Sequence, residues 1–591
     1  LEMRRFLTRQ LHSSAPEGWT ISTAGRRAAS PLLTHTVSNQ SHPLDGYNAF
    51  TCDASLSAAA ATAPWAAAHL SAFGEETATA EWKARADDAH RHPPRLASHD
   101  RFGRRVDRVE YCVAYHELMG LALTRGCASF AWGEHAARPG AHVARGTLIY
   151  LMYQLEPGVC CPLTMTFAAV PALVRAGGVA AGWLPRLCAR AYDPRDVPLG
   201  EKAAATLGMS MTEKQGGSDV RANTSVATAV CTPGGGVGGG EYTLRGHKWF
   251  TSAPMSDGFL TLAQTEEGLS CFLVPRWLPD GNRNSGFTVQ RLKAKLGDHS
   301  NASSEVEYNN AWGVLVGPAG RGVKTIVEMV VHTRLDCIIG SSALMRHCTQ
   351  QAAHHAAHRS AFGSNLAQAP LMRAVLADLA LESEAANATW LRLASSFDSP
   401  ADGSGGLLRR VGTAVAKYWV CKRAPGVAHE AMECLGGNGY VEEGPMARMY
   451  RQAPLNGIWE GSGNVICLDV MRSLRVEPQA VQAFVDELEG ARGAHSLYDG
   501  LLDDVRSELT VGAEDLAALE PRARLVVDKM AIALQASCLL QFGDPVIAAA
   551  YCSSRLPGLA QLQGASYGSR MADSVPRSTQ DLLIDRVMPI G

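Results

Sequence analysis

The hydrophobic pattern of this 591-residue chain changes period twice, and this change limits the folds that it can adopt. From residue 50 to 205, alanine and leucine recur at helical spacing, as in SLSAAAATAPWAAAHLSAF. After about Leu207, short alternating segments separated by Gly, Pro, Asn and Asp indicate an antiparallel β region of about a hundred residues. The helical period returns at about Gly322. The pattern therefore predicts an α+β fold that is mainly α.

A chain of this length is expected to form several domains. We place the boundaries where the pattern changes, which gives an N-terminal helical domain at 34–206, a central antiparallel β domain at 207–320, a C-terminal helical bundle at 321–478 and a helical extension at 479–591. TPGGGVGGG (232–240) is typical of a flexible hairpin loop, and DGSGG (402–406) of a loop between two helices.

Residues 1–33 differ from the rest of the chain in their charge. They contain several Ser and Thr, one acid after Met3 (Glu17), and the basic residues Arg4, Arg5, Arg9, Arg26 and Arg27. This composition is typical of a mitochondrial transit peptide, and a disordered basic tail is the alternative. We therefore expect a mitochondrial matrix location, or otherwise a cytoplasmic one.

The overall composition gives little sign of a charged partner. The formal net charge is -2, so the net charge gives no reason to expect binding to nucleic acid or to an anionic membrane. The fifteen cysteines include no Cys-x-x-Cys pair, which indicates free thiols in a reducing compartment. The apolar stretch GVCCPLTMTFAAVPALV contains two prolines and is expected to be too short and too interrupted to span a bilayer.

Three histidines, His347, His354 and His358, are expected to lie along one helical face. His355-x-x-His358 has the spacing of a metal site, but no acid or cysteine follows at a third defined position. We expect a solvated or interface helix here and no metal.

Seven short motifs carry the strongest functional signal. They are GMSMTEKQGGSDV (208–220), GHKWFTS (246–252), KLGDHSNASSEVEY (295–308), HTRLD (332–336), RSAFG (359–363), AMECLGGNGYVEE (431–443) and IWEGSGN (458–464). In this order and spacing they resemble the acyl-CoA dehydrogenase family of flavoproteins, over roughly residues 34–475. THTVSNQ, CPLTMTFAA and LSCFLVPRWLPDG make the match closer to the AidB-like branch, flavoproteins of the bacterial response to DNA alkylation.

The resemblance implies FAD as cofactor and assigns the first motif to it. A flavin needs hydrogen bonds along its pyrimidine edge and close approach of the backbone. Met211 and Thr212 match the positions that meet the pyrimidine part of the ring. Gly217, with the preceding glycine, lets the backbone come close. Ser218 matches the position that contacts the flavin phosphate or the acyl-CoA.

The second motif supplies the expected aromatic wall. Trp249 matches the residue that packs on the flavin ring, and Thr251 or Ser252 matches the one that bonds near N5. The alternative is that Trp249 is a core residue of a strand.

A further set of residues matches positions that reach the FAD of a neighbouring subunit. Arg359 and Phe362 are the arginine and phenylalanine of this set, and a guanidinium suits a pyrophosphate because it donates two parallel bonds. Gly436 and Gly437 match a glycine loop that takes the same cofactor, although such a pair is also typical of a helix C-terminal turn. The resemblance therefore implies a homo-oligomer, either a dimer or a tetramer.

Glu460 lies after Trp459 and before Gly461-Ser462-Gly463, just outside a predicted helix that Ser462 or Asn464 would cap. A carboxylate there is often a cap or a partner of the helix dipole. In the related dehydrogenases a glutamate at this position is the catalytic base. Trp459 is expected to exclude water and raise its pKa.

The remaining site residues follow from the same resemblance. Trp459, Gly461, Ser462 and Asn464 are expected to lie against the flavin, and Arg334 matches an arginine near the active site that contacts substrate.

The resemblance therefore implies α,β-dehydrogenation of a short or branched acyl-CoA. A flavoprotein is one possible electron acceptor, and the sequence does not identify the acceptor. The alternative is a DNA-associated flavoprotein that protects against alkylation, and a third reading is a flavin-stabilised scaffold with vestigial catalysis. Arg472 matches a basic position that faces DNA in the AidB-like branch. The first half of the tail is acidic, however, with only a small cluster at Arg522, Arg524 and Lys529, so DNA binding is doubtful.

Overall fold

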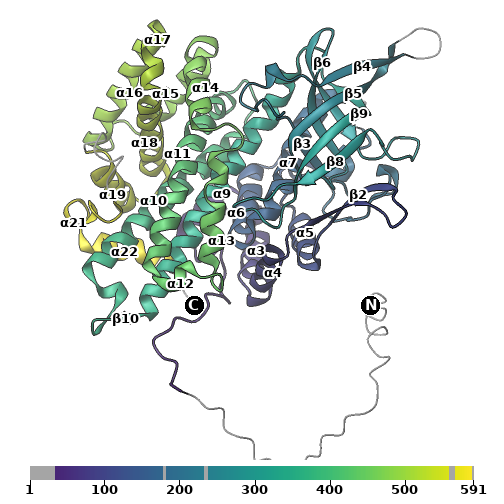
Figure 1. Ribbon diagram of the computed structural model, residues 1–591. Coiled ribbons are helices and arrows are strands. Elements are labelled where there is room, and N and C mark those ends of the chain that lie inside the picture. The colour runs from purple at the N-terminus through teal and green to yellow at the C-terminus, as the bar shows by residue number, and fades with distance from the viewer. Residues whose placement is uncertain (1–33, 178–180, 232–236, 558–565, 589–591) are drawn as a thin grey trace, which may run out of the picture. The chain divides into compact units, whose positions relative to one another are not determined.

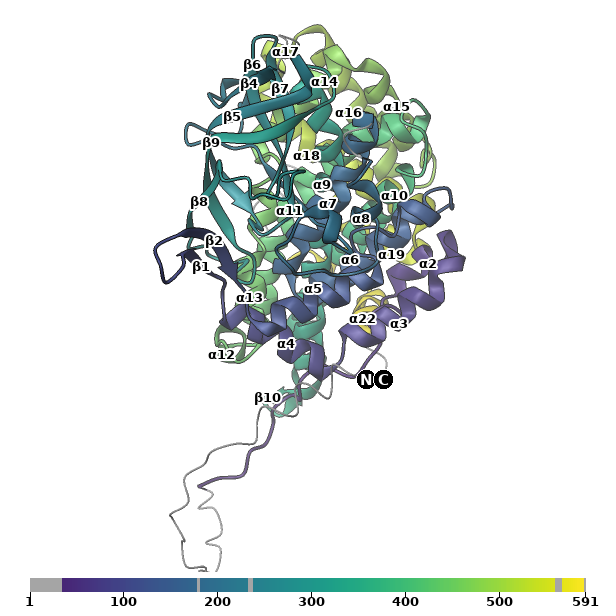
Figure 2. The same ribbon diagram turned by 90° about the vertical axis from the view of Figure 1, so that its right-hand side faces the viewer.

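The computed structural model of the protein describes residues 34–177, 181–231, 237–557 and 566–588 (Figure 1). Contacts divide the chain into Leu1–Gln40 and Ser41–Gly591. Every helix and strand named below lies in the second unit, which is mainly helical, with the strands of residues 207–316 gathered on one side of the helices (Figures 1 and 2). The predicted transit segment, 1–33, lies outside the described residues.

The N-terminal region is helical, as predicted, with one exception. Its helices are α2 (Ser57–Thr62), α3 (Ala67–Thr77), α4 (Ala80–Arg91), α5 (Val113–Arg125), α6 (Ala141–Leu155), α7 (Cys160–Ala176) and α8 (Leu184–Leu187). The exception is an antiparallel hairpin of β1 (Arg95–His99) and β2 (Arg105–Glu110), where we expected helix. Its strands are short and rich in charged residues, so no clear hydrophobic alternation marks them.

The apolar stretch around α7 is continuous, so the prediction that its prolines interrupt it was wrong. Pro162 lies in the first turn, where its missing N–H has no partner to lose, and Pro171 lies inside the helix. Among the described residues, Pro157–Ala176 and Leu516–Phe542 are long and apolar enough to cross a membrane, but 89% and 72% of their windows are buried inside the protein.

The β region closes on itself. Its strands are β3 (Leu207–Ser210), β4 (Val226–Cys231), β5 (Val237–Ser252), β6 (Gly258–Thr265), β7 (Gly268–Pro275), β8 (Phe287–Leu292) and β9 (Ser303–Val316). The order is β3-β6-β4-β5-β9-β7, β8 pairs with β9, and β7 returns to β6. Pairing is mostly antiparallel, as predicted, but β6 pairs parallel with β3 and β4. Alternate side chains such as Phe259, Phe272 and Tyr308 fill the interior.

The predicted glycine loop is shorter than expected. Residues 237–240 already belong to β5, whereas 232–236 lie outside the described residues.

The C-terminal bundle begins at Gly322, where the helical period returns. Its helices are α9 (Gly322–His358), α10 (Pro370–Ser396), α11 (Ser404–Cys434), α12 (Gly437–Tyr440), α13 (Pro445–Gln452) and α14 (Gly463–Val476). A two-stranded hairpin, β10 (Ser360–Ala361) and β11 (Ser364–Asn365), joins α9 to α10. The loop predicted at 402–406 ends earlier, because α11 starts at Ser404.

The tail after residue 477 is helical, as predicted, and packs on the bundle (Figure 1). Its helices are α15 (Pro478–Glu489), α16 (Ser496–Glu514), α17 (Leu516–Leu519), α18 (Ala523–Phe542), α19 (Pro545–Arg555), α21 (Met571–Ser574) and α22 (Arg577–Val587). Apolar residues of the tail, the bundle and the N-terminal helices share one buried cluster. A polar bond, Trp419 Nε1 to Gln535 Oε1 at 2.9 Å, fixes α18 on α11.

Candidate active site

The turn between η9 (Leu455–Gly457) and α14 holds an unusual backbone. Glu460 has φ 57° and Gly461 has φ 100°, so two consecutive residues lie in the left-handed region. Glycine adopts this region freely, whereas for another residue it costs on the order of 1–3 kcal/mol and persists only where contacts hold it. Strain of this kind concentrates at functional sites.

The start of α14 lies where the sequence predicted it, but the predicted capping hydrogen bond is not formed. Ser462 occupies the N-cap position, yet within the described chain its side chain makes no capping hydrogen bond. Asn464 Oδ1 instead accepts a bond from Arg524 Nε at 2.8 Å, which ties α14 to α18.

Two cations from the bundle hold the strained turn. The Lys417 ammonium on α11 donates to the carbonyl oxygen of Trp459 at 2.7 Å and to that of Gly461 at 2.5 Å. On α9, Arg334 Nε donates to the carbonyl oxygen of Glu460 at 3.2 Å. All three carbonyl groups around the carboxylate are thus fixed, and the side chain of Glu460 has a defined direction.

The carboxylate of Glu460 accepts one hydrogen bond, from Thr333 Oγ1 to Oε2 at 2.6 Å. Burial raises the pKa of Glu460 above its usual value, while the Thr333 bond and the charges of Lys417 and Arg334 oppose the rise. A carboxylate with a raised pKa is a stronger base than an exposed one, which suits removal of a proton from a weak acid.

Arg334 is held at its other end. Its Nη1 bonds Asp469 Oδ2 at 2.9 Å, and Arg410 bonds the same carboxylate at 2.8 Å. These partners bring the pKa of Asp469 down to about 2 despite its burial. In this structure Arg334 positions the turn of Glu460, and its contact with substrate stays a prediction.

The turn and the β region meet on one apolar floor. Trp459 and Met211 both pack against a buried cluster that includes Cys161 and Met165 of α7. The predicted flavin residue Met211 and the Glu460 turn, 249 residues apart in sequence, therefore border the same apolar cluster.

Backbone geometry explains the glycines of the first motif. The Trp249 amide donates to the carbonyl oxygen of Thr212 at 2.8 Å, so the segment after β3 runs beside β5. A Cβ at Gly217 would lie 2.4 Å from Thr212 Oγ1, a clash that requires glycine. The buried ion pair of Glu213 and Lys248, at 2.9 Å, fixes the same segment. Its glycines and Ser218 are exposed, where a ligand has access.

Only some side chains of the second motif are exposed enough to contact a flavin. Trp249 is half-buried and carries the Lys293 ammonium 3.4 Å from its ring centroid. Thr251 is fully buried and its hydroxyl bonds Ser210. Of the two residues predicted near N5, half-buried Ser252 is therefore the better placed.

The residues predicted to reach a neighbouring FAD lie far from Glu460. Arg359 follows α9, 25 residues after Arg334, which at 1.5 Å per residue is roughly 37 Å. Phe362 is fully exposed with φ 53°, at the tip of the β10–β11 hairpin. Gly436 has φ 59°, and a Cβ there or at Gly437 would meet no described atom within 4 Å. Arg359 is therefore remote from the Glu460 of its own chain, and the roles of all four residues stay predictions.

Sequence reasoning missed Thr333, Lys417 and Asp469. Thr333 stands next to Arg334 inside a quoted motif, and its role follows only from the fold. Lys417 carried a signal, because a lysine in the apolar helical run AVAKYWV must find partners when it is buried.

The histidines of α9 differ in their exposure. His347 and His355 are buried, so the prediction of a solvated or interface face was wrong for them. No group of three His, Cys, Asp or Glu side chains in the described ranges could hold a metal ion.

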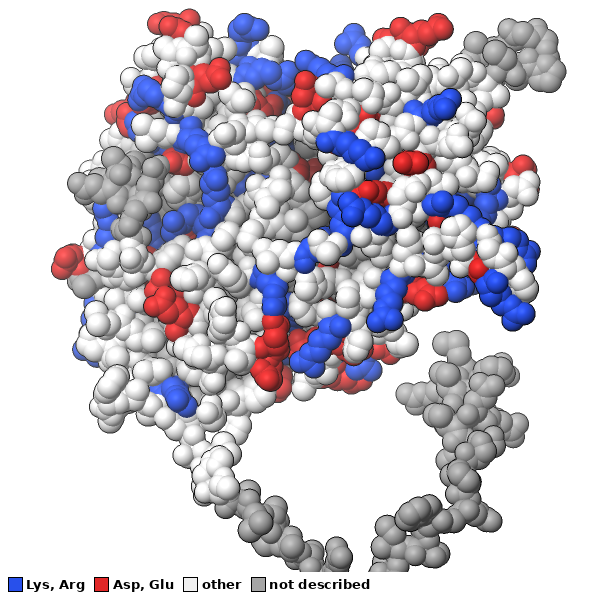
Figure 3. All heavy atoms as spheres, in the orientation of Figure 1, with Lys and Arg blue, Asp and Glu red and all other residues white. Residues whose placement is uncertain are grey.

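The tail cations are largely paired with acids. On the face in Figure 3, cationic and anionic side chains are interspersed over much of the surface. Arg522 and Lys529 bond Glu508 at 2.6 and 2.9 Å, and Lys529 also bonds Asp504 at 2.8 Å. Arg472 lies 3.8 Å from the carboxylate of Asp469. DNA binding gains no support from these pairs and stays a prediction.

Comparison with known proteins agrees with the fold. Residues 39–194 match the adaptive response protein AidB N-terminal domain, 208–311 the acyl-CoA dehydrogenase middle domain, and 320–475 the acyl-CoA dehydrogenase C-terminal domain. AidB of Escherichia coli (strain K12) is 41% identical over 88% of this chain and 94% of its own. Acyl-CoA dehydrogenase family member 11 of Caenorhabditis elegans is 29% identical over 77% of this chain and 74% of its own.

A solved structure shows the same architecture. The crystal structure of Caenorhabditis elegans ACDH-11 in complex with C11-CoA has a TM-score of 0.79 and 25% identity, and the match covers 90% of this chain and 95% of that one. The chain belongs to the acyl-CoA dehydrogenase family, whose members typically bind FAD. Within that family it is a protein of the AidB branch, which confirms the resemblance seen in the motifs.

Proposed function

We propose that the protein is an FAD-dependent oxidoreductase that introduces an α,β double bond into a short or branched acyl-CoA, with Glu460 as the base. The observation that carries the proposal is the geometry of Glu460. Its strained backbone is held by Lys417 and Arg334, its carboxylate is oriented by Thr333, and burial raises its pKa. A glutamate that only caps a helix needs neither the strained backbone nor the oriented carboxylate nor the raised pKa.

Each group has a defined part in the proposed reaction. The Glu460 carboxylate takes the α-proton, the electron pair of that C–H bond becomes the second bond between Cα and Cβ, and a hydride leaves Cβ. When bound, FAD supplies the acceptor for this hydride. The acyl-CoA is thereby oxidised by two electrons, and a second flavoprotein is the proposed final acceptor. The apolar floor of Trp459, Cys161 and Met165 excludes water around the base.

The residues present fit a flavin. Gly216 and Gly217 expose their backbone, a Cβ at Gly217 would meet the side chain of Thr212, and Met211 packs against the same apolar cluster as Trp459. These contacts would hold the ring between the β region and the Glu460 turn.

A second copy of the chain completes the proposed cofactor site. The roughly 37 Å between Arg334 and Arg359 along α9 supports this, because the guanidinium of Arg359 is suited to a pyrophosphate but is remote from its own Glu460. Phe362, exposed on a left-handed turn, has the strain and exposure of a contact residue. We therefore propose a homo-oligomer of two or four chains.

An anaerobic titration tests the proposed function. The purified flavin-loaded protein is mixed with a panel of acyl-CoAs that includes isovaleryl-CoA and C11-CoA, the latter because the ACDH-11 complex contains it. We expect one acyl-CoA to bleach the flavin and Glu460→Gln to abolish bleaching while it retains the flavin. A fully loaded flavin that no acyl-CoA bleaches would contradict the enzymatic proposal.

We also propose import into mitochondria through residues 3–33. Their excess of arginine over acid supports this. A reporter fused to these residues is expected in mitochondria, and a diffuse cytosolic signal would contradict the proposal.

A further inference from the structure

A cavity of about 460 Å³ lies between α5, the segment 191–206 and the chain after β5. Its described lining does not include Glu460 or any residue that we assign to the flavin. Apolar and aromatic side chains form much of it, among them Tyr111, Tyr115, Met119, Leu123, Ala204 and Met255. A concave, largely apolar cavity of this size is typical of a small-molecule site.

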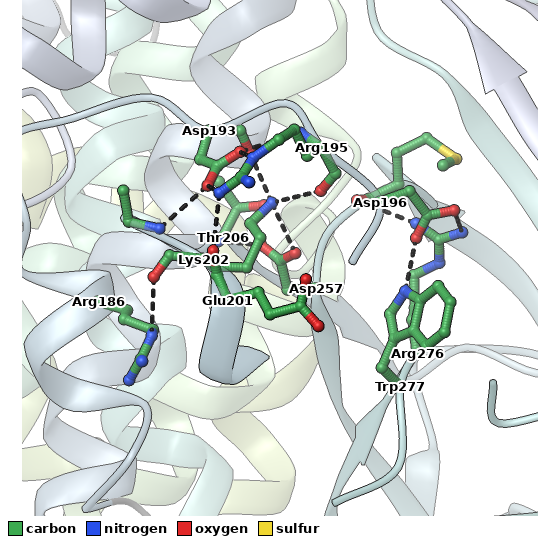
Figure 4. Close-up of polar contacts among 12 residues, drawn as sticks. Arg186, Asp193, Arg195, Asp196, Glu201, Lys202, Thr206, Asp257, Arg276 and Trp277 are labelled. Carbon is green, nitrogen blue, oxygen red and sulfur yellow. Dashed lines mark hydrogen bonds and ion pairs between the residues drawn. The ribbon is translucent and has the colours of Figure 1, made fainter. Parts of the chain in front are cut away.

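One wall of the cavity is fixed by a buried lysine. Lys202 Nζ donates to the carbonyl oxygens of Asp193 at 2.6 Å and Arg195 at 2.8 Å, and it pairs with the Asp257 carboxylate at 3.0 Å (Figure 4). All three donors of the ammonium are therefore used within the protein.

A second part of the wall is fixed by the half-buried carboxylate of Asp196. Asp196 accepts bonds from Trp277 Nε1 at 2.8 Å and Arg276 Nη2 at 3.0 Å (Figure 4). Arg283 bonds the same carboxylate at 2.5 Å. The cavity is thus preformed, and a ligand does not have to order its walls.

Charge around the cavity cancels. Its described lining carries four cations and four carboxylates, namely Arg108, Arg195, Lys202 and Arg276, and Glu110, Asp193, Asp196 and Asp257. Each carboxylate has a cation within 3.0 Å. An anionic or cationic ligand would gain no net attraction and would lose its hydration, so an uncharged ligand is favoured.

Two hydroxyl groups in the cavity wall could form hydrogen bonds with a ligand. The hydroxyl groups of Tyr111 and Ser256 are buried and make no hydrogen bond of good geometry with the described residues, although the hydroxyl of Tyr111 interacts with Tyr115. Tyr111 stacks on Tyr115 with 4.0 Å between ring centroids, whereas the hydroxyl of Tyr192 is already bonded to His116 Nδ1 at 2.7 Å. A buried hydroxyl without a partner is unfavourable, and a ligand oxygen would satisfy it.

We propose that this cavity binds an uncharged, mainly apolar or aromatic small molecule that carries one hydroxyl or carbonyl oxygen, which bonds Tyr111 or Ser256. The site is separate from the proposed dehydrogenase site and does not depend on it. The two are neighbours, because Cys161 precedes Pro162 in the cavity wall and packs in the same cluster as Trp459.

Isothermal titration calorimetry of the full-length, flavin-loaded protein tests the proposal with three related probes. The probes are 2-naphthol, which is neutral and has one hydroxyl, naphthalene, which lacks it, and 2-naphthoate, which is charged. We expect 2-naphthol to bind, and each of the other two to bind at least about fivefold more weakly, because one hydrogen bond is lost or one charge is desolvated.

Variants locate the binding site. Tyr111→Phe is expected to weaken 2-naphthol about fivefold and Ser256→Ala to a smaller extent, whereas Ala204→Phe fills the cavity and abolishes binding. Tyr308→Phe is the matched control, because Tyr308 also has a buried hydroxyl without a partner in the described chain but lies in the β interior. It is expected to bind as the wild type does.

Several outcomes would overturn the proposal. They are absence of binding by 2-naphthol, unchanged binding by both Tyr111→Phe and Ala204→Phe, or equal binding of 2-naphthoate. If Ala204→Phe does not fold, Tyr111→Phe decides, since it removes a single oxygen atom. Heat of binding is measured without turnover, so a failure of the dehydrogenase proposal leaves this test intact.

Discussion

Replacing Thr333 by valine removes one hydroxyl beside Glu460 and keeps the shape of the side chain. This hydroxyl lies 2.6 Å from Glu460 Oε2 and 3.0 Å from the carbonyl oxygen of Val330. When Glu460 is ionised, the hydroxyl donates to its carboxylate. When Glu460 is protonated, the carboxyl donates to the hydroxyl, which then turns its proton to Val330. The bond therefore exists in both states but is stronger in the ionised one.

The difference between the two states sets the magnitude. A hydrogen bond to a charged group contributes about 1.5–3 kcal/mol and a neutral one about 1 kcal/mol. A difference of about 1.4 kcal/mol corresponds to about one pKa unit. Burial already raises the pKa of Glu460, and Thr333→Val is expected to raise it by about one further unit. Because a base acts only when deprotonated, the rise of activity with pH should move about one unit upward.

The assay is the rate of flavin reduction by acyl-CoA in rapid mixing between about pH 5 and 9. Thr349→Val is the matched control, because Thr349 is buried on the same helix and donates only to the Met345 carbonyl oxygen, at 2.8 Å. An unmoved profile in Thr333→Val, or an equal movement in the control, would refute the reasoning.

Three further substitutions test the base, the flavin motif and the proposed interface. Burial raises the pKa of Glu460 in the folded protein above its value in the unfolded chain. Ionisation of Glu460 therefore destabilises the folded protein as pH rises from the unfolded to the folded pKa. Glu460→Gln should unfold at a higher temperature than wild type at neutral pH, and at the same temperature as wild type below that pH range. Gly217→Ala, with its Cβ 2.4 Å from Thr212 Oγ1, should weaken flavin retention about tenfold or more, whereas Gly200→Ala, which meets no described atom within 4 Å, should leave it unchanged. Phe362→Ala should lower the sedimentation mass without a change in circular dichroism, and an unchanged mass would count against its place in the interface.

The sequence predicted the order of helical and β regions because each has a long run of one hydrophobic period. It did not predict the β1–β2 hairpin, whose strands Arg95–His99 and Arg105–Glu110 are rich in charged residues and carry no clear apolar alternation. It also misjudged α7, where burial on all sides stabilises a helix that contains Pro171. Tertiary packing overrides local propensity in both cases.

The sequence motifs predicted which residues belong to the site, but they did not predict the contacts between those residues. Glu460 was found from the sequence, but the residues that orient it, Thr333 and Lys417, lie 127 and 43 residues before it and meet it only in the fold. The left-handed backbone at Glu460 was equally invisible, because glutamate gives no local signal for it. Contacts of this kind depend on how α9 and α11 pack, which no local pattern encodes.

The most direct test of Glu460 as the base is exchange of the α-protons of a bound acyl-CoA with solvent deuterium, followed by proton NMR without any electron acceptor. We expect exchange in the wild type, slower exchange at a given pH in Thr333→Val, and none above background in Glu460→Gln with its flavin bound. Exchange at the wild-type rate in Glu460→Gln would show that another group removes the proton and would contradict the assignment of Glu460 as the base.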